Sequence, residues 1–376
     1  MKKFLYIILL PVFLLLSCEE NSVQQGNNSD EALPSLEIYI DEDSYLNLLS
    51  NKIVDFETGC RFSYKGQLYS GIISTSGAGS KYADKWGYKI ELTDGQFVEG
   101  LSEFNLSSQI YDNSALHTVL ASYLYKQAGF PVFYSRHVFV KINNVDKGLY
   151  PLIEKVEEPF FDSRNLSVTE LFKVGFDAKF SFEETNNVQY FFEKKIPDDE
   201  NFSSLIEFIH ARDTSNVSTI HESLGKFLDI ENYLKYHAIT SLINNVDAFT
   251  NNFLIWKEFP NSAFKIIPWD FDKAFDGSPS GKLAGYNQIV TKLFQNKEML
   301  NEYKRLLVLY NETLLTETNL FPIIDSTAAV IKEAYKKDPN YGLMGRDFDY
   351  EIQQLKNYIS ERHKFIEENV EAYNGF

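Results

Sequence analysis

The sequence is poor in cysteine and in basic residues. Its two cysteines, Cys18 and Cys60, are too few for the disulfide framework of a small secreted scaffold. The chain has 36 Lys and Arg against 53 Asp and Glu, a formal net charge of −17. Nucleic-acid phosphates need a basic face, so we expect no nucleic-acid partner. The histidines form no His-Glu-x-x-His pair and Gly-x-Ser-x-Gly is absent, which disfavours zinc peptidase and serine hydrolase chemistry.

Apolar residues are plentiful enough for a large folded region. Hydrophobic residues make up 44% and aromatic residues 15% of the 376 positions. This suffices for one large domain or two modest lobes, and it excludes disorder or a fibrous repeat for most of the chain. Aromatic residues in such numbers are more often core than a sugar-binding platform, so a glycosidase is disfavoured.

The first residues indicate export. Lys2 and Lys3 precede an apolar run over residues 4–16 that is short for a membrane span and is typical of a signal peptide, which we place at residues 1–17. The run ends in Leu15-Leu16-Ser17-Cys18, which resembles a bacterial lipobox. We therefore predict that the Cys18 thiol is lipidated and anchors the protein to a membrane.

Residues 18–34 are polar and lack apolar periodicity, so we predict a flexible tether. The segment Cys18-Glu19-Glu20-Asn21 resembles the acidic signal that sends lipoproteins of some Gram-negative groups to the outer face of the outer membrane. We expect an exported lipoprotein of the cell envelope, in the outer membrane and facing the exterior. A protein partner would then lie on the envelope or be exported, and no feature of the sequence sets the oligomeric state.

The first half of the folded region favours strands. Period-two alternation predicts strands at residues 36–40, 86–92, 138–142 and 148–153, and a hairpin over 62–73 that turns at Lys65-Gly66. Residues 143–146 are typical of the turn between the last two strands. One helix is predicted after Asp112-Asn113-Ser114, with apolar residues at helical spacing from Leu116 to Leu124 and a stop at Gly129.

The second half favours helices. After about residue 201 the pattern is helical, and Asp229 can cap a helix that ends near Asn244-Asn245. Two short apolar strands follow at residues 253–257 and 264–269, and helical periodicity returns from residue 287 to the end.

Acidic residues flank the pair of strands in the second half. Asp247 precedes Asn252 by five residues, the spacing of a kinase catalytic loop, and Asp270 and Asp272 follow the second strand. Because a hairpin returns the chain to its starting point, we expect these oxygens in one cleft, where they suit Mg²⁺. The alternative for these residues is ordinary turn and cap chemistry.

Short motifs spread over residues 36–373 accompany these acids. They are Gly77-Ala78-Gly79-Ser80 with Lys85 and Tyr88-Lys89-Ile90; Phe104-Asn105-Leu106 with Asp112 and Ser114; Gly148-Leu149-Tyr150 with Glu154; Asp247 with Asn251-Asn252; Ile267-Pro268-Trp269-Asp270-Phe271-Asp272; and Arg362 with Phe365. Together they resemble the CotH kinase family, atypical protein-kinase-like proteins named for a bacterial spore coat protein.

The resemblance implies an α+β, two-lobe atypical protein-kinase-like fold over residues 35–374. A β-rich N-terminal lobe would cover about 35–157 and a mainly helical C-terminal lobe about 158–374. It also implies ATP-dependent phosphorylation of protein Ser or Thr with Mg²⁺ or Mn²⁺. Asp247 would be the catalytic-loop acid, and the metal ligands would be Asn252, Asp270 and Asp272.

The resemblance also implies a lysine that contacts the phosphates of the nucleotide, and two lysines are candidates. The family pattern favours Lys85 as the phosphate contact, whereas Lys89 lies within a predicted strand and better fits a generic kinase. Glu154 would lie near adenine and ribose. The alternatives are a solvated strand face for Lys89, shared with Glu91, and a surface position for Glu154.

Two arginines of the family pattern are missing. Residues 72–76 contain none, and His117 occupies another arginine position. Guanidinium groups make bidentate contacts with phosphate or carboxylate that His and Ser cannot reproduce. A catalytically degenerate kinase fold, acting as a surface binding or adhesion lipoprotein, is therefore the alternative. The retained acids favour the enzyme, because they would repel one another without a cation.

Overall fold

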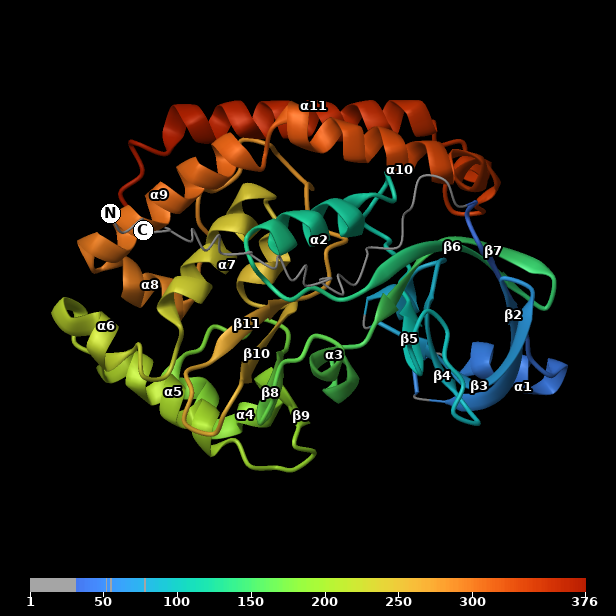
Figure 1. The fold of residues 1–376 in the computed structure, drawn as a ribbon, viewed down its shortest axis with the longest axis horizontal. Helices are drawn as coiled ribbons and strands as arrows, with labels where there is room; N and C mark the ends of the chain where they lie inside the picture. Colours follow the sequence, from blue (N-terminus) through green and yellow to red (C-terminus); the bar gives the residue numbers. More distant parts are fainter. Residues whose placement is uncertain (1–31, 52, 55, 78) are drawn as a thin grey trace, which may run out of the picture.

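The computed structural model describes residues 32–376 except 52, 55 and 78. The predicted signal peptide, the lipidation site Cys18 and most of the tether lie outside these residues, as does Ala78 of the Gly-Ala-Gly-Ser motif. The described chain is a mixture of strands and helices, as predicted, and its strands form a closed barrel and a separate four-stranded sheet (Figure 1).

The barrel is built from the first seven strands. Around the barrel the strands follow the order β1-β2-β3-β4-β5-β7-β6, and a parallel pairing of β1 with β6 closes it. Their bounds are β1 (Ser35–Tyr39), β2 (Glu57–Tyr64), β3 (Gln67–Ser76), β4 (Gly87–Leu92), β5 (Glu103–Leu106), β6 (Ser135–Ile142) and β7 (Val145–Glu154), with helix α1 (Glu42–Ser50) after β1 and the short 3₁₀ helix η1 (Ser80–Tyr82) after β3.

Two tight hairpins in the barrel follow directly from the sequence. Lys65 and Gly66 connect β2 to β3 with φ of 47° and 78°. Asn143 and Asn144 connect β6 to β7 with φ of 49° and 64°. Positive φ at both central residues is the signature of the hairpin turn that Asn and Gly favour. The second turn is shorter than predicted, because Val145 already pairs within β7.

The second sheet has the order β11-β10-β8-β9 and is antiparallel throughout. Its strands are β8 (Glu170–Val174), β9 (Phe192–Ile196), β10 (Phe253–Lys257) and β11 (Lys265–Pro268). The two strands predicted in this half, β10 and β11, are confirmed as a hairpin, with Phe253 opposite Pro268. The other two strands were not predicted.

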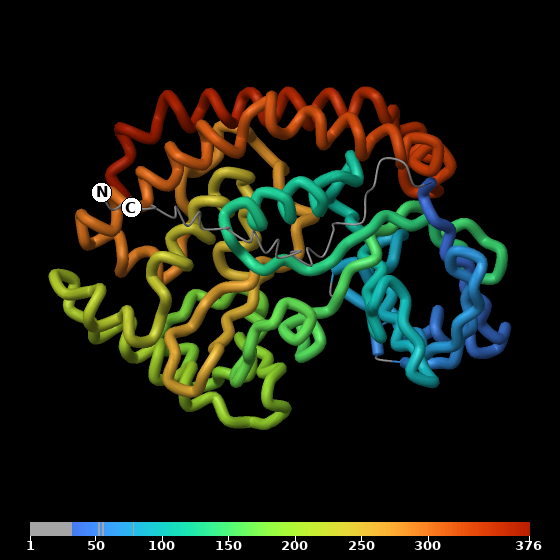
Figure 2. Tube along the Cα trace, in the orientation of Figure 1, coloured from blue at the N-terminus to red at the C-terminus, as the bar shows by residue number. Residues whose placement is uncertain are grey.

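Helices surround this sheet and form most of the second half. They are α2 (His117–Gln127), α3 (Glu158–Asp162), α4 (Val188–Phe191), α5 (Ser203–Thr214), α6 (Ile220–Ser223), α7 (Ile230–Leu242), α8 (Gln288–Phe294), α9 (Lys297–Thr313), α10 (Glu317–Lys337) and α11 (Phe348–Asn369), with the short 3₁₀ helices η2 (Phe182–Asn187), η3 (Val217–Thr219), η4 (Val246–Phe249) and η5 (Gly342–Met344). Figure 2 shows α10 and α11 running side by side along one edge of the molecule.

Helix α2 lies between two barrel strands in sequence but packs elsewhere. Its apolar residues, including Leu120, Leu124 and Tyr125, belong to the large core that it shares with the helices and the second sheet, not to the core of the barrel. The helix begins at His117, later than predicted. The carboxylate of Asp112 nevertheless acts at its start, accepting a 2.7 Å hydrogen bond from the His117 backbone N–H.

A buried ion pair joins the barrel to the end of α10. The ammonium of Lys85 lies 3.0 Å from Oδ2 of Asp338, which also accepts a 2.6 Å hydrogen bond from the Leu149 backbone N–H. The side chains are 4% and 0% exposed. Gly148 leaves room for the carboxylate, since a Cβ there would lie 2.1 Å from Oδ2. This contact gives a structural reason for the Gly-Leu-Tyr motif, because its glycine makes room for the carboxylate and its leucine donates a hydrogen bond to it.

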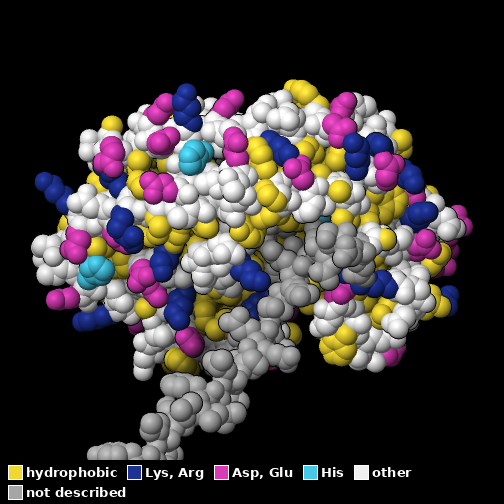
Figure 3. Space-filling view, turned by 45° about the horizontal axis from the view of Figure 1, so that its top comes forward, with side chains coloured by type: hydrophobic (Ala, Val, Ile, Leu, Met, Phe, Trp, Pro, Cys, Tyr) yellow, Lys and Arg dark blue, Asp and Glu magenta, His cyan; other side chains and the backbone are white. Residues whose placement is uncertain are grey.

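The surface carries charges of both signs. Figure 3 shows Lys and Arg interspersed with Asp and Glu over the face in view. Within the described residues, no helix combines the length and the apolar character that a membrane span requires.

Candidate functional site

In the Pro-Trp-Asp-Phe-Asp segment, aromatic side chains that pack on the core alternate with acidic side chains that do not. Phe271 is buried and stacks on Phe133 at 5.2 Å between ring centroids, and Trp269 meets the same ring edge-on at 5.0 Å. The intervening acids, Asp270 and Asp272, are only partly covered. The aromatic residues therefore anchor the segment, and the alternation leaves the carboxylates at the surface of the core.

The backbone of Asp270 is held in an unusual conformation. Its φ is 55°, in the left-handed region, which Asp and Asn tolerate better than most residues. The side-chain amide of Asn245 donates a 3.3 Å hydrogen bond to the Asp270 carbonyl oxygen. The Asp272 backbone N–H also hydrogen-bonds the Asp270 carboxylate. These contacts fix where the carboxylate lies.

Asp247 lies in the short helix η4, directly after α7. Neighbouring side chains fix this helix by donating to its carbonyl oxygens: the Tyr236 hydroxyl donates a 2.6 Å hydrogen bond to the Ala248 oxygen, and the Asn287 amide donates a 2.7 Å hydrogen bond to the Phe249 oxygen. The Oδ2 of Asp247 lies 2.7 Å from the ammonium of Lys273. One carboxylate oxygen is thus paired, which leaves Oδ1 available.

Asn252 comes next to the acids because of the hairpin. It precedes β10 with φ of 57°, and its carbonyl oxygen accepts a 3.2 Å hydrogen bond from the backbone N–H of Trp269. Asp270 is the following residue, so the hairpin brings the two acidic segments together as the sequence predicts.

The charges of these acids act on one another. Burial raises the pKa of Asp270, and the negative charge of Asp247 raises it further, while Lys173 and Lys273 act in the opposite direction. Burial raises the pKa of Asp272 to about 8, with further contributions from Asp270 and Asp112. Mutually repelling carboxylates in a partly desolvated site are an arrangement that a cation relieves.

These oxygens suit a Mg²⁺ site that is completed by the phosphates of a nucleotide. They suit less well a closed site in which the protein supplies every ligand. Among the described residues, no three His, Cys, Asp or Glu side chains gather closely enough to form a metal site by themselves. Mg²⁺ usually takes one or two carboxylates and fills its other positions with water and substrate phosphates. Asp270 and Asp272, with the amide oxygen of Asn252, match that donor set. The Oδ1 of Asn245 is also buried there, and it has no hydrogen-bond partner within the part of the chain that the structure describes.

The two lysines predicted for phosphate lie in contact with acids elsewhere. Lys85 is held by Asp338 and the Leu149 carbonyl oxygen, 2.6 Å away. The ammonium of Lys89 lies 3.4 Å from both Glu57 and Glu103 on the outside of the barrel. The assignment of either lysine to phosphate stays a prediction.

The carboxylate of Glu154 is likewise bound by other groups of the protein. The guanidinium of Arg164 contacts both its carboxylate oxygens, at 3.0 and 2.6 Å, and the Tyr134 backbone N–H donates a further 2.8 Å hydrogen bond. The side chain is buried at the end of β7. These contacts stabilise the junction after the barrel, and the predicted role beside adenine stays a prediction.

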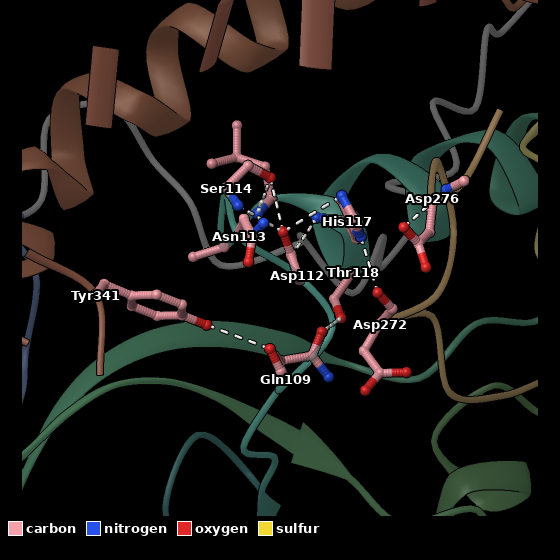
Figure 4. A network of polar contacts seen from close by, with 12 residues as sticks. Gln109, Asp112, Asn113, Ser114, His117, Thr118, Asp272, Asp276 and Tyr341 are labelled. Atoms are coloured by element: carbon pink, nitrogen blue, oxygen red, sulfur yellow. Dashed lines mark hydrogen bonds and ion pairs between the residues drawn. The ribbon is translucent and has the colours of Figure 1, made fainter. Parts of the chain in front are cut away.

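His117 connects α2 to the acidic segment (Figure 4). Its Nδ1 lies 2.8 Å from the Asp272 carbonyl oxygen, so this nitrogen donates, and Nε2 lies 3.4 Å from Oδ1 of Asp112. Figure 4 shows the Asp272 carboxylate pointing away from the imidazole. The residue at the missing-arginine position therefore still holds the Asp272 backbone.

Sequence reasoning missed several residues that contact these acids or act on their charge. Lys273 follows Asp272 directly, and that adjacency was an available signal. The sequence predicts only that Asn245 lies near a helix end. Lys173 lies in β8, a strand that was not predicted. No local pattern marks the last two, since their relation to Asp270 depends on packing.

The raised pKa of Asp272 predicts a pH dependence of Mg²⁺ binding. The folded chain keeps this proton up to about pH 8, whereas the ordinary value is 3.8, so the group's ionisation destabilises the fold as pH rises through that window. Because Mg²⁺ must displace this proton, and the pKa of Asp270 is raised as well, Mg²⁺ affinity should rise by at least about tenfold per pH unit below pH 8. Calorimetric titration of Mg²⁺ at pH 6, 7 and 8 measures this, and a flat profile would contradict it.

Comparison with known proteins matches most of the chain. The family model described as CotH kinase protein matches residues 64–366. The inner spore coat protein H of Bacillus subtilis (strain 168) is 24% identical over 301 residues, which cover 76% of this chain and 83% of the relative.

Solved structures show weaker likeness. The crystal structure of the Helicobacter pylori proinflammatory kinase CtkA has a TM-score of 0.33 at 12% identity, covering 76% of this chain and 94% of that one. The Shewanella oneidensis MR-1 toxin–antitoxin complex of HipA, HipB and operator DNA gives 0.31 at 12% identity, covering 90% and 72%. Both scores are below 0.5, so neither likeness bears on activity.

Proposed function

The chain belongs to the CotH kinase family, and on that premise we propose that it transfers the γ-phosphate of ATP to a Ser or Thr hydroxyl of a protein, with Mg²⁺ or Mn²⁺. The observation that supports this most is that two separate acidic segments lie close together, so that the negative charge of Asp247 raises the pKa of both Asp270 and Asp272. Phosphoryl transfer needs little more from a protein than positioned charges.

Asp270 and Asp272 would hold the metal ion with their carboxylates, and Asn252 with its amide oxygen. The ion supplies positive charge that offsets the charge of the transferring phosphoryl group. In the free protein the pKa of both carboxyl groups is raised. They therefore give up protons when the site is loaded, and this makes binding depend on pH.

Asp247 would position the acceptor hydroxyl and take its proton. Lys273 contacts Oδ2 at 2.7 Å, which orients the carboxylate. The Oδ1 atom can then accept the hydrogen bond of a Ser or Thr hydroxyl. The ring of Tyr111 packs against the same ammonium at 4.5 Å and limits its movement.

A second candidate is a catalytically degenerate kinase fold that binds a partner at the cell surface. Two observations favour it: the described residues contain no preformed three-acid metal site, and an arginine position of the family pattern is His117. Under either function we propose that the protein is exported and anchored through lipid on Cys18.

The two functions differ in what nucleotide does to the folded protein. Ligands that bind the native state raise its thermal midpoint, and a concentration one hundred times Kd stabilises by about 2.7 kcal/mol. We expect millimolar ATP with Mg²⁺ to raise the midpoint, and the wild-type protein to transfer radiolabelled phosphate to itself or to co-exported proteins. A midpoint unmoved by ATP, together with no transfer, would support the binding protein instead.

A further inference from the structure

A site made of carboxylates needs a cation from the protein to receive nucleotide. The triphosphate is strongly negative, and Asp247, Asp270 and Asp272 would repel it where a metal ion does not intervene. Lys273 is paired with Asp247, and Lys85 and Lys89 contact acids elsewhere. A further ammonium group beside these acids, free of such a contact, would therefore serve the phosphates.

Lys173 differs from the other lysines of the described chain. It is half-buried, and within the described residues its ammonium makes no hydrogen bond and no ion pair. Among the other lysines in the described ranges without such a contact, Lys126, Lys226, Lys282, Lys297 and Lys337 are exposed, and the half-buried Lys147 has its ammonium 5.7 Å from the centre of the Tyr45 ring. A half-buried lysine whose ammonium meets no anion of the described chain is placed to bind an anion that a ligand supplies.

The sheet register places Lys173 beside the acidic site. Lys173 lies opposite Leu254, only two residues after Asn252, because β8 pairs with β10. Beyond the strand the two chains stay together, and the Ala178 backbone N–H donates a 2.9 Å hydrogen bond to the Thr250 carbonyl oxygen. The lysine thus lies one strand away from the segment that leads from Asp247 to Asn252.

Its charge also reaches the principal acid. The ammonium of Lys173 lowers the pKa of Asp270 against the effect of burial, although the two groups form no direct ion pair in the described chain. Lys173 is thus close enough to act on this carboxylate and still has all three N–H donors available.

We infer that Lys173 contacts the phosphate oxygens of the bound nucleotide, and that this contact comes from the second sheet rather than from the barrel. The inference rests on the proposed function, because it names a residue for the nucleotide of that reaction. The ammonium gives charge-assisted hydrogen bonds to the phosphates and neutralises part of their charge beside the carboxylates.

Lys173→Met tests this, with Lys173→Arg to restore the charge. Binding of ATP, ADP and adenosine is measured by calorimetry, with and without Mg²⁺, on variants whose thermal midpoints are first shown to match the wild type. We expect Lys173→Met to weaken ATP binding about tenfold to a hundredfold and adenosine binding not at all, with partial recovery in Lys173→Arg. The measurement without Mg²⁺ excludes the explanation that Lys173→Met weakens ATP binding only by changing how Asp270 binds the metal ion.

Lys265→Met is the matched control. Lys265 lies on β11 of the same sheet, and its ammonium pairs with Glu258 at 2.9 Å. The change removes the same charge, and we expect ATP affinity to stay unchanged. If the wild type binds ATP and Lys173→Met binds it equally well, or loses adenosine to the same extent, the inference about Lys173 is overturned while the proposed function stands. Failure of the wild type to bind any of the three ligands overturns both.

Discussion

Asp270→Asn is expected to lower phosphate transfer by about a thousandfold or more while leaving the protein folded. The carboxylate is the principal proposed metal ligand, and losing it removes charge stabilisation that the reaction needs. Asn is preferable to Ala for this test, because Asp270 has φ of 55° and Asn tolerates that conformation. Transfer of radiolabelled phosphate at saturating ATP measures the effect.

The same variant should be slightly more stable than the wild type without metal. The pKa of Asp270 is raised in the fold, chiefly by burial, so its ionised form destabilises the native state above the ordinary pKa of 3.8. A neutral amide removes that effect. We therefore expect a higher thermal midpoint without Mg²⁺ at pH 7 and a smaller rise when Mg²⁺ and ATP are added.

Asp94→Asn is the matched control for this change. Asp94 has φ of 60° in an exposed turn after β4, so the substitution is the same in a similar backbone conformation. Transfer by this variant should equal that of the wild type. Labelling by Asp270→Asn at the wild-type rate would exclude Asp270 from the mechanism.

Arg362→Met is expected to destabilise the protein by about 4 kcal/mol, more than an average substitution. Arg362 is 0% exposed and no carboxylate among the described residues pairs with it. Its guanidinium instead donates to five backbone carbonyl oxygens, at 2.6 Å to Ser241, 3.4 Å to Leu242, and 2.9 Å to each of Pro279, Gly281 and Lys282. Met fills much of the volume but leaves these oxygens without donors.

The position of these carbonyl groups links Arg362 to the site. Ser241 and Leu242 end α7, directly before the segment that carries Asp247, and a cation is favourable at a helix C-terminus. Residues 279–282 follow the segment that carries Asp270. We therefore expect Arg362→Met to weaken stabilisation by Mg²⁺ and ATP even at temperatures where the variant is folded.

Arg212→Met is the control for a buried arginine away from the acids. Arg212 is 5% exposed and donates to one carbonyl oxygen, that of Phe180 at 2.7 Å, and to the carboxylate of Asp213. Denaturant unfolding should give a smaller loss of stability, and nucleotide stabilisation should be unchanged. Equal losses in the two variants would contradict the role given to Arg362.

Local patterns predicted the elements near the site well. The helix capped by Asp229 and the hairpin of β10 and β11 both form, because their caps and alternation are set by neighbours in sequence. Strands β8 and β9 were missed. They are five residues each and the burial of β8 does not alternate, so no period-two pattern marks it.

The start of α2 shows which contacts local sequence patterns do not predict. The sequence indicates a helix after Asp112, but not that its first turn would hold the Asp272 carbonyl oxygen through His117. Nor does a pattern predict that Lys85 would be buried against Asp338, 253 positions away. Such contacts depend on how two distant surfaces pack, and their residues are unremarkable in their own neighbourhoods.

The sequence by itself determined the family, the order of the acidic segments and the hairpin that brings Asp247 and Asp270 together, because turns, caps and alternation act over a few residues. Only the tertiary structure decided which lysines are paired with acids, that Lys173 lies near Asp270 without an ion pair to it, and which carbonyl groups accept hydrogen bonds from Arg362. Those outcomes follow from packing between elements far apart in the chain, where burial and the need to satisfy each buried polar group select the partners.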